Sequence, residues 1–386
     1  MPILYLLTDG FGGLGGIAQV NRDFLKAACS FHGGSEVLAL PRHIVADCGA
    51  LPRGLAYDAG AARGKLAYLA RAARAIAERK RYDLVISAHI NLQPLAKLMS
   101  LMSGAPSLLL LHGIEAWTPP SGGVRAIAAK GADWVAAVSR FTLERFATWA
   151  RVPANRSIVL PCAVDLARFT PGKPSPAVLE KYGIARGTIV LSLGRLSSAE
   201  RYKGTDELLE ALPALRAEVP DVLCVIAGGG DDRSRLEAKA RQLGIVEHVR
   251  FTGHVPDSDV VDLYRAARAF TLAGHGEGFG IVLLEAMACG IPVVASKLDG
   301  SFEAIGHGML GVAVDPTDAR SLVAGLLEGL RRPAGIRPAG LEMFSYDAFQ
   351  ARVHDALGRA IASARRPGQS RRAGGEESER GSDEAG

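Results

Sequence analysis

Short apolar runs, bounded by turn residues, alternate with longer helix-like stretches along almost the whole chain. This alternation is typical of parallel α/β units, because each buried strand needs a crossover to return the chain to the same end of the sheet. The first set of predicted strands is 3–7, 36–40, 83–87, 107–111, 134–138 and 157–160. The second set is 188–193, 222–227, 249–251, 269–272, 292–296 and 311–314. The pattern therefore predicts two doubly wound sheets.

The length supports the same division. A chain of 386 residues, 48% of them hydrophobic, is too long for one typical core. Residues 170–176 lie between the two sets of strands. They read Thr-Pro-Gly-Lys-Pro-Ser-Pro and have the composition of a linker. We therefore expect two domains with an interdomain cleft, and ligands at the carboxyl ends of the strands. Residues 364–386 lack aromatic and β-branched side chains, which predicts a disordered tail.

Charge and cysteine usage narrow the class of protein. The net charge is +5, and no segment resembles a nucleic-acid-binding module, so we expect no nucleic acid partner. The cysteines form no C-x-x-C pair, which indicates reduced, mostly buried thiols: Cys29, Cys48, Cys162, Cys224 and Cys289. No basic segment precedes the first apolar run, and no apolar run reaches the roughly 20 residues of a membrane span. A cytoplasmic location is expected.

Residues 277–285 read Glu-Gly-Phe-Gly-Ile-Val-Leu-Leu-Glu and carry two carboxylates around a glycine turn. Gly278 and Gly280 can adopt backbone geometries that other residues resist. The apolar run predicts a helix from 281 to about 288, which Gly290 and Pro292 end. Helical side chains lean toward the N-terminus, so Glu277 and Glu285 can converge on one polyol ligand. The alternative is that both only stabilise the helix dipole.

Residues 10–16 read Gly-Phe-Gly-Gly-Leu-Gly-Gly and follow the first predicted strand. They formally contain G-x-G-x-x-G. A dinucleotide site also needs an acid at the end of the second strand, where this chain has Leu40-Pro41-Arg42. A glycine loop bordering the cleft is therefore favoured over an NAD(P) site.

Polar side chains follow three other predicted strands. His112 and Ser139 each stand at a strand end, although histidine is often structural and Ser139 can equally be a helix N-cap. Arg195 and Lys203 flank one strand-to-helix junction. Two cations beside a helix N-terminus can bind a diphosphate without a metal. The alternative is a pair of solvated surface cations.

Residues 63–81 read RGKLAYLARAARAIAERKR, with a stripe of Leu66, Leu69, Ala73 and Ile76 at helical spacing. Seven cations and one acid, Glu78, occupy this segment. Such a helix can lie on an anionic membrane surface. It can equally be a packed helix with a solvated face, and the residues leave both open.

Together these segments resemble the retaining glycosyltransferases of the large family four, also called group 1, which have the GT-B fold of two Rossmann-like domains. The resemblance covers roughly residues 1–363. It rests on 277–296, on Gly194-Arg195-Leu196 and Tyr202-Lys203-Gly204, and on 251–255. In style the chain is similar to bacterial enzymes that extend exopolysaccharides or lipid-linked saccharides.

The resemblance implies a role for each candidate residue. Glu277, with Gly278, Phe279 and Gly280, would hold the donor sugar, and Glu285 the ribose of the nucleotide. Arg195 and Lys203 would bind the diphosphate. Gly15 and Gly16 would line the cleft near the phosphates and the acceptor. His112 would face the reacting centre, and Ser139 would contact the substrate or donor. No metal or cofactor is implied, because the nucleotide sugar is a co-substrate.

The implied domains are an acceptor-side domain of residues 1–165 and a nucleotide-sugar domain of residues 166–345. A helix of about 346–363 would pack back on the first domain. The sequence departs from the family pattern at Ala273-Gly274-His275-Gly276, where many relatives carry Pro-Ser. It also has a longer loop between Arg195 and Lys203, and no double glycine in 297–303.

The resulting expectation is a retaining, metal-independent hexosyltransferase. It would move a hexose from a UDP-glucose-type donor or GDP-mannose to a glycan or polyprenyl-diphosphate-linked saccharide. It would be cytoplasmic or peripheral at the inner face of the plasma membrane. The alternatives are a nucleotide-sugar epimerase or hydrolase on the same fold, and an NAD(P)-dependent oxidoreductase.

Overall fold

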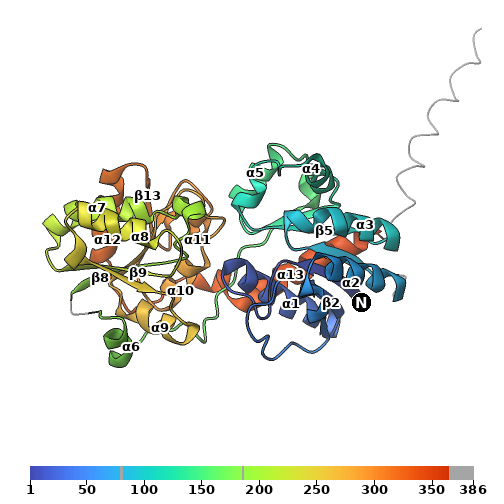
Figure 1. The fold of residues 1–386 in the computed structure, drawn as a ribbon, viewed down its shortest axis with the longest axis horizontal. Helices are drawn as coiled ribbons and strands as arrows, with labels where there is room; N and C mark the ends of the chain where they lie inside the picture. The colour runs from blue at the N-terminus through green and yellow to red at the C-terminus, as the bar shows by residue number, and fades with distance from the viewer. Residues whose placement is uncertain (79–80, 185–186, 365–386) are drawn as a thin grey trace, which may run out of the picture.

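The computed structural model describes residues 1–78, 81–184 and 187–364, which form two lobes of parallel sheet and helix (Figure 1). The N-terminal sheet has the strand order β3-β2-β1-β4-β5-β6-β7, and the C-terminal sheet has the order β10-β9-β8-β11-β12-β13. All named strand pairs are parallel. The predicted α/β fold with two Rossmann-like domains is confirmed.

The elements follow the sequence pattern closely. The strands are β1 Pro2–Leu7, β2 Glu36–Pro41, β3 Leu55–Tyr57, β4 Leu84–Ser87, β5 Ser107–Leu111, β6 Trp134–Ala137, β7 Ser157–Val159, β8 Thr188–Leu193, β9 Val222–Ala227, β10 Val249–Gly253, β11 Ala269–Leu272, β12 Val293–Ser296 and β13 Val312–Val314. The α-helices are α1 Gly16–Ser30, α2 Lys65–Glu78, α3 Gln93–Ser103, α4 Gly123–Lys130, α5 Arg140–Ala147, α6 Pro176–Lys181, α7 Thr205–Glu218, α8 Arg233–Gln242, α9 Asp257–Ala266, α10 Ile281–Ala288, α11 Ser301–Ala304, α12 Ala319–Arg331 and α13 Tyr346–Ala364. Only β3 was not predicted, because its short Leu-Ala-Tyr run is never fully buried.

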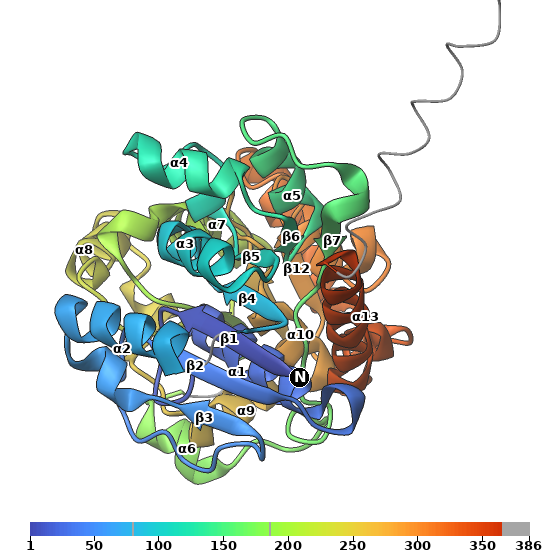
Figure 2. The same cartoon turned by 90° about the vertical axis from the view of Figure 1, so that its right-hand side faces the viewer.

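The N-terminal sheet is covered on both faces. One apolar cluster joins the sheet to α1 and α13, and two others join it to α2 with α3 and to α4 with α5. Figure 2 shows α2, α3 and α4 as successive helices of this lobe. Helix α2 packs through Tyr68, Ala72 and Ala75, so Leu66 and Leu69 of the predicted stripe face solvent.

The chain passes between the lobes twice, and the two passages meet. The Val164 amide donates to the Phe344 carbonyl oxygen at 2.9 Å, and Val164 forms a parallel bridge with Ser345. Helix α13 then returns to the N-terminal lobe and packs against α1, with Phe349, Val353 and Leu357 buried (Figure 1).

The proline-rich segment 170–176 is not a free linker, contrary to its composition. Arg265 of α9 donates to the Thr170 carbonyl oxygen at 3.0 Å, and the Ser175 amide donates to Asp262 at 3.0 Å. The segment therefore already belongs to the C-terminal lobe. Proline makes it stiff, and anchoring stiff chain costs little entropy.

Two further observations bear on the sequence predictions. All five cysteines are free, and only Cys48 is not buried. No helix in the described part of the chain is both long and apolar enough to cross a membrane. The predicted disordered tail lies outside the described residues from residue 365 onward.

Candidate functional site

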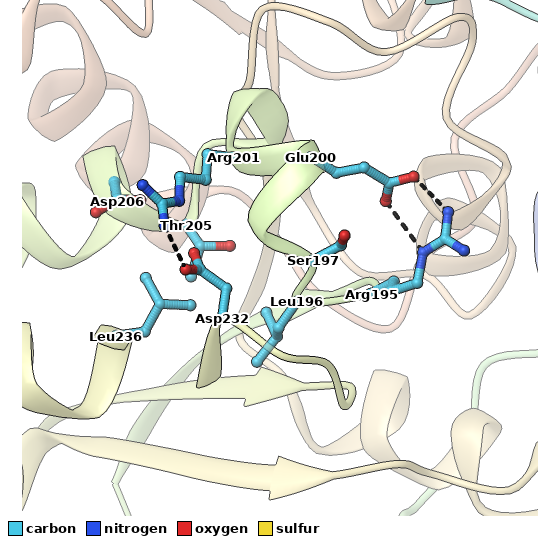
Figure 3. A pocket seen from close by; sticks show the side chains of 9 residues that line it. All are labelled: Arg195, Leu196, Ser197, Glu200, Arg201, Thr205, Asp206, Asp232 and Leu236. Atoms are coloured by element: carbon cyan, nitrogen blue, oxygen red, sulfur yellow. Dashed lines mark hydrogen bonds and ion pairs between the residues drawn. The ribbon is translucent and has the colours of Figure 1, made fainter. Parts of the chain in front are cut away.

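Arg195 and Lys203 are brought together by a carboxylate that the sequence did not single out. Arg195 follows β8, and Lys203 ends the 3₁₀ segment Ser198–Lys203. The Arg195 Nε donates to Glu200 Oε2 at 3.1 Å, and its Nη2 donates to Oε1 (Figure 3). The Lys203 Nζ lies 3.1 Å from the same Oε2. The two cations thus share one carboxylate, and their binding of a diphosphate stays a prediction.

A network of ion pairs fixes the 3₁₀ segment Ser198–Lys203 to the neighbouring helices α7 and α8. Arg201 donates to Asp232 at 3.0 Å (Figure 3), and Arg235 donates to the same carboxylate and to Asp206. Arg235 lowers the pKa of Asp206 to about 2 by hydrogen bonding, and Lys239 adds to this effect. Asp232 is almost completely buried, and charge-assisted hydrogen bonds are strong in such surroundings. The loop therefore has a rigid support.

The loop also packs tightly on the segment that precedes Glu277. Gly204 has φ +85°, and a Cβ there would lie 2.2 Å from the Ala273 carbonyl oxygen. A Cβ on Gly274 would lie 2.2 Å from the Tyr202 carbonyl oxygen, and one on Gly276 would meet the Tyr202 ring at 2.3 Å. This explains why the chain has Ala-Gly-His-Gly at 273–276. The glycines let Lys203 approach the start of the Glu277 segment.

The turn from Glu277 to Gly280 has the strained geometry that its glycines predict. Gly280 has φ +92° and begins α10. Gly278 is needed for close approach, because a Cβ there would lie 1.9 Å from the His112 carbonyl oxygen of the other lobe. The turn therefore lies directly against the N-terminal lobe.

Asp299 fixes the backbone of Glu277. Its Oδ2 accepts a hydrogen bond from the Glu277 amide at 2.8 Å, and its Oδ1 accepts from the Ser301 amide at 3.0 Å. A Cβ on Gly300 would lie 2.0 Å from the Gly278 carbonyl oxygen. Asp299 is 2% exposed. The Asp-Gly-Ser sequence that departs from the family pattern thus serves as a brace for the turn.

The two glutamates have separate surroundings. Burial raises the pKa of Glu277 to about 7, the Lys203 ammonium opposes this, and Asp299 and Glu200 add to it. Burial also raises the pKa of Glu285 to about 7. The Tyr264 hydroxyl donates to Glu285 Oε2 at 2.8 Å, and Arg168 is a nearby cation. Each glutamate therefore has its own cationic neighbour, and no described contact joins the two.

The glycine loop of the N-terminal lobe faces α10. A Cβ on Gly16, the first residue of α1, would lie 4.0 Å from the Ile281 side chain. Gly15 has φ +88° and nothing within 4 Å of its Cβ position. Arg22 donates to the carbonyl oxygens of Gly10 and Gly13 at 3.0 and 2.9 Å and thereby sets the shape of the loop. Gly15 and Gly16 thus lie beside the Glu277 turn with open space above Gly15.

His112 directly follows β5 and lies at the same junction. Its Nε2 lies 2.8 Å from the Ala88 carbonyl oxygen, whereas its Nδ1 is buried without a partner. A carbonyl oxygen can only accept, so Nε2 is the donor, and in that tautomer Nδ1 can accept a hydrogen bond. An unpaired buried polar atom is costly, which favours a ligand that donates to it.

Ser139 is the N-cap of α5. Its Oγ accepts from the Thr142 amide at 3.1 Å, and the residue is fully buried. Glu303 of the other lobe accepts from the Arg140 and Phe141 amides, each at 2.8 Å. The amides at the N-terminal end of α5 are thus bound by the side chains of Ser139 and Glu303. The ligand contact of Ser139 stays a prediction.

Sequence reasoning missed Glu200, Asp299, Arg168 and the run Gly228–Gly230. A signal existed for the last, because three glycines follow the fully buried β9. Cβ atoms on Gly228 and Gly230 would each lie 1.9 Å from the carbonyl oxygens of Gly194 and Leu196. These glycines fix the backbone on both sides of Arg195. In the described ranges no three His, Cys, Asp or Glu side chains gather closely enough to hold a metal ion.

Two protein-family models match this chain. The family model described as Glycosyl transferases group 1 matches residues 178–338, and the one described as Glycosyltransferase Family 4 matches residues 28–168. The GDP-mannose-dependent alpha-(1-6)-phosphatidylinositol monomannoside mannosyltransferase of Mycolicibacterium smegmatis is 39% identical over 246 residues. That alignment spans 61% of this chain and 63% of the relative, less than two thirds of its length. The protein of the same name from Mycobacterium tuberculosis is 33% identical over 302 residues, 74% of this chain and 77% of the relative.

Solved structures share the fold. HepE from Anabaena, crystallised with UDP and glucose, superposes with a TM-score of 0.73 at 22% identity, covering 93% of this chain and 99% of that one. Sucrose-phosphate synthase from Thermosynechococcus elongatus gives a TM-score of 0.67 at 20% identity, covering 94% and 97%. The two family models, the long mycobacterial alignment and the shared GT-B fold agree, and the chain belongs to glycosyltransferase family four.

Proposed function

We propose that this glycosyltransferase is a retaining, metal-independent hexosyltransferase with a nucleoside-diphosphate hexose as donor. One observation carries the proposal. Arg195 and Lys203 share the Glu200 carboxylate, and the backbone at Lys203 packs on the segment that precedes Glu277. The Glu277 turn lies against the glycine loop and His112 of the other lobe. Transfer of a sugar needs cations for the diphosphate, hydrogen-bonding groups for the sugar and open space for the acceptor hydroxyl close together.

The donor would lie across the strand ends of the C-terminal lobe. Arg195 and Lys203 would bind the diphosphate and stabilise the charge that develops on it as the sugar leaves, with large effect in a preorganised site. Glu277 and the amides of Phe279 and Gly280 would hold sugar hydroxyls. Glu285, fixed by Tyr264, would hold the ribose. None of these residues need act as a covalent nucleophile.

The reaction would break the bond between the anomeric carbon and the diphosphate oxygen and form one to the acceptor oxygen on the same face. The acceptor proton would pass to a phosphate oxygen of the leaving group. His112 would accept a hydrogen bond at Nδ1 from a sugar hydroxyl beside the reacting carbon, because its other nitrogen is held by Ala88. The His112 ring would orient the sugar in this scheme.

The names of the mycobacterial relatives favour GDP-mannose as donor and a lipid-borne acceptor within the broader expectation of a glycan or polyprenyl-linked saccharide. Such an acceptor requires contact with a membrane. We propose that the N-terminal lobe supplies this contact at the inner face of the plasma membrane, through α2 and the neighbouring α3 and α4.

These three helices carry much of the exposed apolar surface. Of the seventeen large hydrophobic side chains that are exposed in the described ranges, seven belong to them: Leu66, Leu69, Leu98, Leu101, Met102, Val124 and Ile127. The same helices hold six Lys and Arg residues and one acid, Glu78. Apolar side chains among cations suit an anionic lipid surface, where each cation contributes about 1 kcal/mol.

Transfer assays test the proposed activity. Lys203→Ala and Glu277→Gln should each reduce transfer from the preferred donor by at least about a hundredfold, because both remove contacts to the donor. The matched control is Lys297→Ala, since Lys297 forms a partly exposed pair with Asp315 and none with Glu200. The donors are UDP-glucose and GDP-mannose, with lipid-linked and free glycan acceptors.

Product analysis separates the alternatives. An anomer of retained configuration, formed only with acceptor, supports the proposal. A converted or hydrolysed sugar nucleotide formed without acceptor would indicate an epimerase or hydrolase. Binding of NAD(P) without UDP or GDP would indicate an oxidoreductase. Full turnover by both variants would exclude the assigned donor site.

A further inference from the structure

The cationic pair already holds one anion that belongs to the protein. Both oxygens of Glu200 are engaged by Arg195, and Lys203 shares one of them. No other carboxylate in the described ranges forms a salt bridge with either cation. Glu200 therefore occupies the position at which the proposed diphosphate would meet these two side chains.

The carboxylate lies inside the loop while the arginine remains open. The Glu200 side chain is 18% exposed and that of Lys203 24%, against 68% for Arg195. Glu200 also departs from 3₁₀ geometry, with φ −125° and ψ 32°, so the chain bends where its side chain turns to the cations. The longer loop between Arg195 and Lys203 supplies the residues for this bend.

Electrostatics agrees with a tight, ionised contact. Partial burial by itself would raise the pKa of Glu200, but hydrogen bonds from Arg195 and the charge of Lys203 outweigh it and hold the pKa below its ordinary value. The carboxylate thus stays charged at neutral pH. It must move or share its partners when a second anion arrives, because like charges in one site repel.

We infer that Glu200 is an internal stand-in for the donor diphosphate, which keeps Arg195 and Lys203 in place in the empty enzyme and competes with anions for them. The inference rests on the proposed function. A ligand with several negative charges displaces one carboxylate readily, whereas a singly charged anion does not. Glu200 therefore acts as a specificity-determining residue that favours diphosphates over weaker anions, and it returns to the cations as the nucleoside diphosphate leaves.

The test is whether pyrophosphate binds more tightly or more weakly when the charge of Glu200 is removed. Titration calorimetry measures the binding of inorganic pyrophosphate, UDP and GDP to wild type, Glu200→Gln and Glu200→Ala. Loss of the competing charge should tighten pyrophosphate binding in both variants by about two- to fivefold, as expected for partly exposed ion pairs. The donor KM should fall by a similar factor without a rise in kcat. If Glu200 only maintained the loop, both variants would bind more weakly.

Glu210→Gln is the matched control. It removes one negative charge from the same lobe, but Glu210 pairs with Lys239 and not with the two cations. Pyrophosphate affinity should stay at the wild-type value. Thermal unfolding of each variant establishes that it is folded.

The outcomes separate the two claims. If wild type binds pyrophosphate and a nucleoside diphosphate but the folded Glu200 variants bind pyrophosphate equally or more weakly, the stand-in role is wrong and the proposed function stands. An equal gain in Glu210→Gln would also overturn the role, since the effect would then be one of general charge. If wild type binds none of these anions, the proposed function fails and the inference fails with it.

Discussion

At the scale of single residues, the partly buried carboxyls of Glu277 and Glu285 make the stability of the folded protein depend on pH. Each has a pKa of about 7 in the folded protein, against 4.5 ordinarily. Between these values the folded state binds protons that the unfolded state has released. The contribution of both groups to the free energy of unfolding therefore falls as pH rises from about 4.5 to about 7.

Neutral amides should remove this penalty. Glu277→Gln and Glu285→Gln are each expected to raise the unfolding temperature by a few degrees at pH 8 and to change it little at pH 4.5. Thermal unfolding of ligand-free protein at both pH values measures this. Glu218→Gln is the control, because Glu218 is exposed at the end of α7. A lower unfolding temperature at pH 8 would show that both carboxylates are stabilised by their neighbours.

The sequence was sufficient to mark candidate residues by their position. His112 and Arg195 were singled out because each follows a buried strand, and Glu277 because it precedes a glycine turn and an apolar helix; in the structure the Glu277 turn lies against His112. Glu200 and Asp299 were not, since their partners are set by how two loops meet in space. No spacing rule connects Asp299 to the Glu277 amide, although the hydrogen bond between them is only 2.8 Å long.

At the scale of elements, the strands were predictable because parallel strands are buried on both faces and read as continuous apolar runs. The loops between them were not. The contact between 202–204 and 273–276 depends on glycines that look like ordinary turn residues in sequence. Only the structure shows why glycine is required at these positions, because a Cβ atom there would collide with the opposing backbone.

This loop contact can be tested with one methyl group. Gly204→Ala should weaken donor binding and lower stability, because its Cβ would lie 2.2 Å from the Ala273 carbonyl oxygen. Gly244→Ala is matched to it, with φ +67° but open space around its Cβ position. The control should lose about 1–2 kcal/mol of stability from the left-handed backbone and keep its donor affinity. UDP and GDP titration with chemical unfolding compares them, and equal donor affinity in both variants would refute the role of the contact.

At the scale of the whole molecule, the exposed apolar side chains are unevenly placed. Leu66 and Leu69 of the stripe predicted in 63–81 are exposed, at 83% and 51%, whereas Ile76 packs against the apolar core of the lobe. The exposed apolar side chains of α3 and α4 in the same lobe could not be predicted from the sequence. Which face of a helix is buried depends on the elements that pack against it.

Liposome flotation tests this surface. Leu66→Ser/Leu69→Ser and Arg71→Glu/Arg74→Glu should each reduce recovery with anionic vesicles several-fold, and added salt should weaken the wild type. Leu243→Ser/Val246→Ser is the control, since it removes exposed apolar side chains from the C-terminal lobe. Equal recovery of all four proteins would exclude the surface. Loss of binding in the control alone would place the membrane contact on the other lobe.

The meeting of the two passages at Val164 and Phe344 has a mechanical consequence. Two lobes joined by one flexible chain passage can rotate relative to each other in any direction. Two passages that are hydrogen-bonded to each other allow fewer directions of rotation. The C-terminal lobe is, in topological terms, an insertion into the N-terminal one, and α13 closes the circuit on α1. Any movement that separated the Glu277 turn from His112 would therefore have to bend both passages together at Val164 and Phe344.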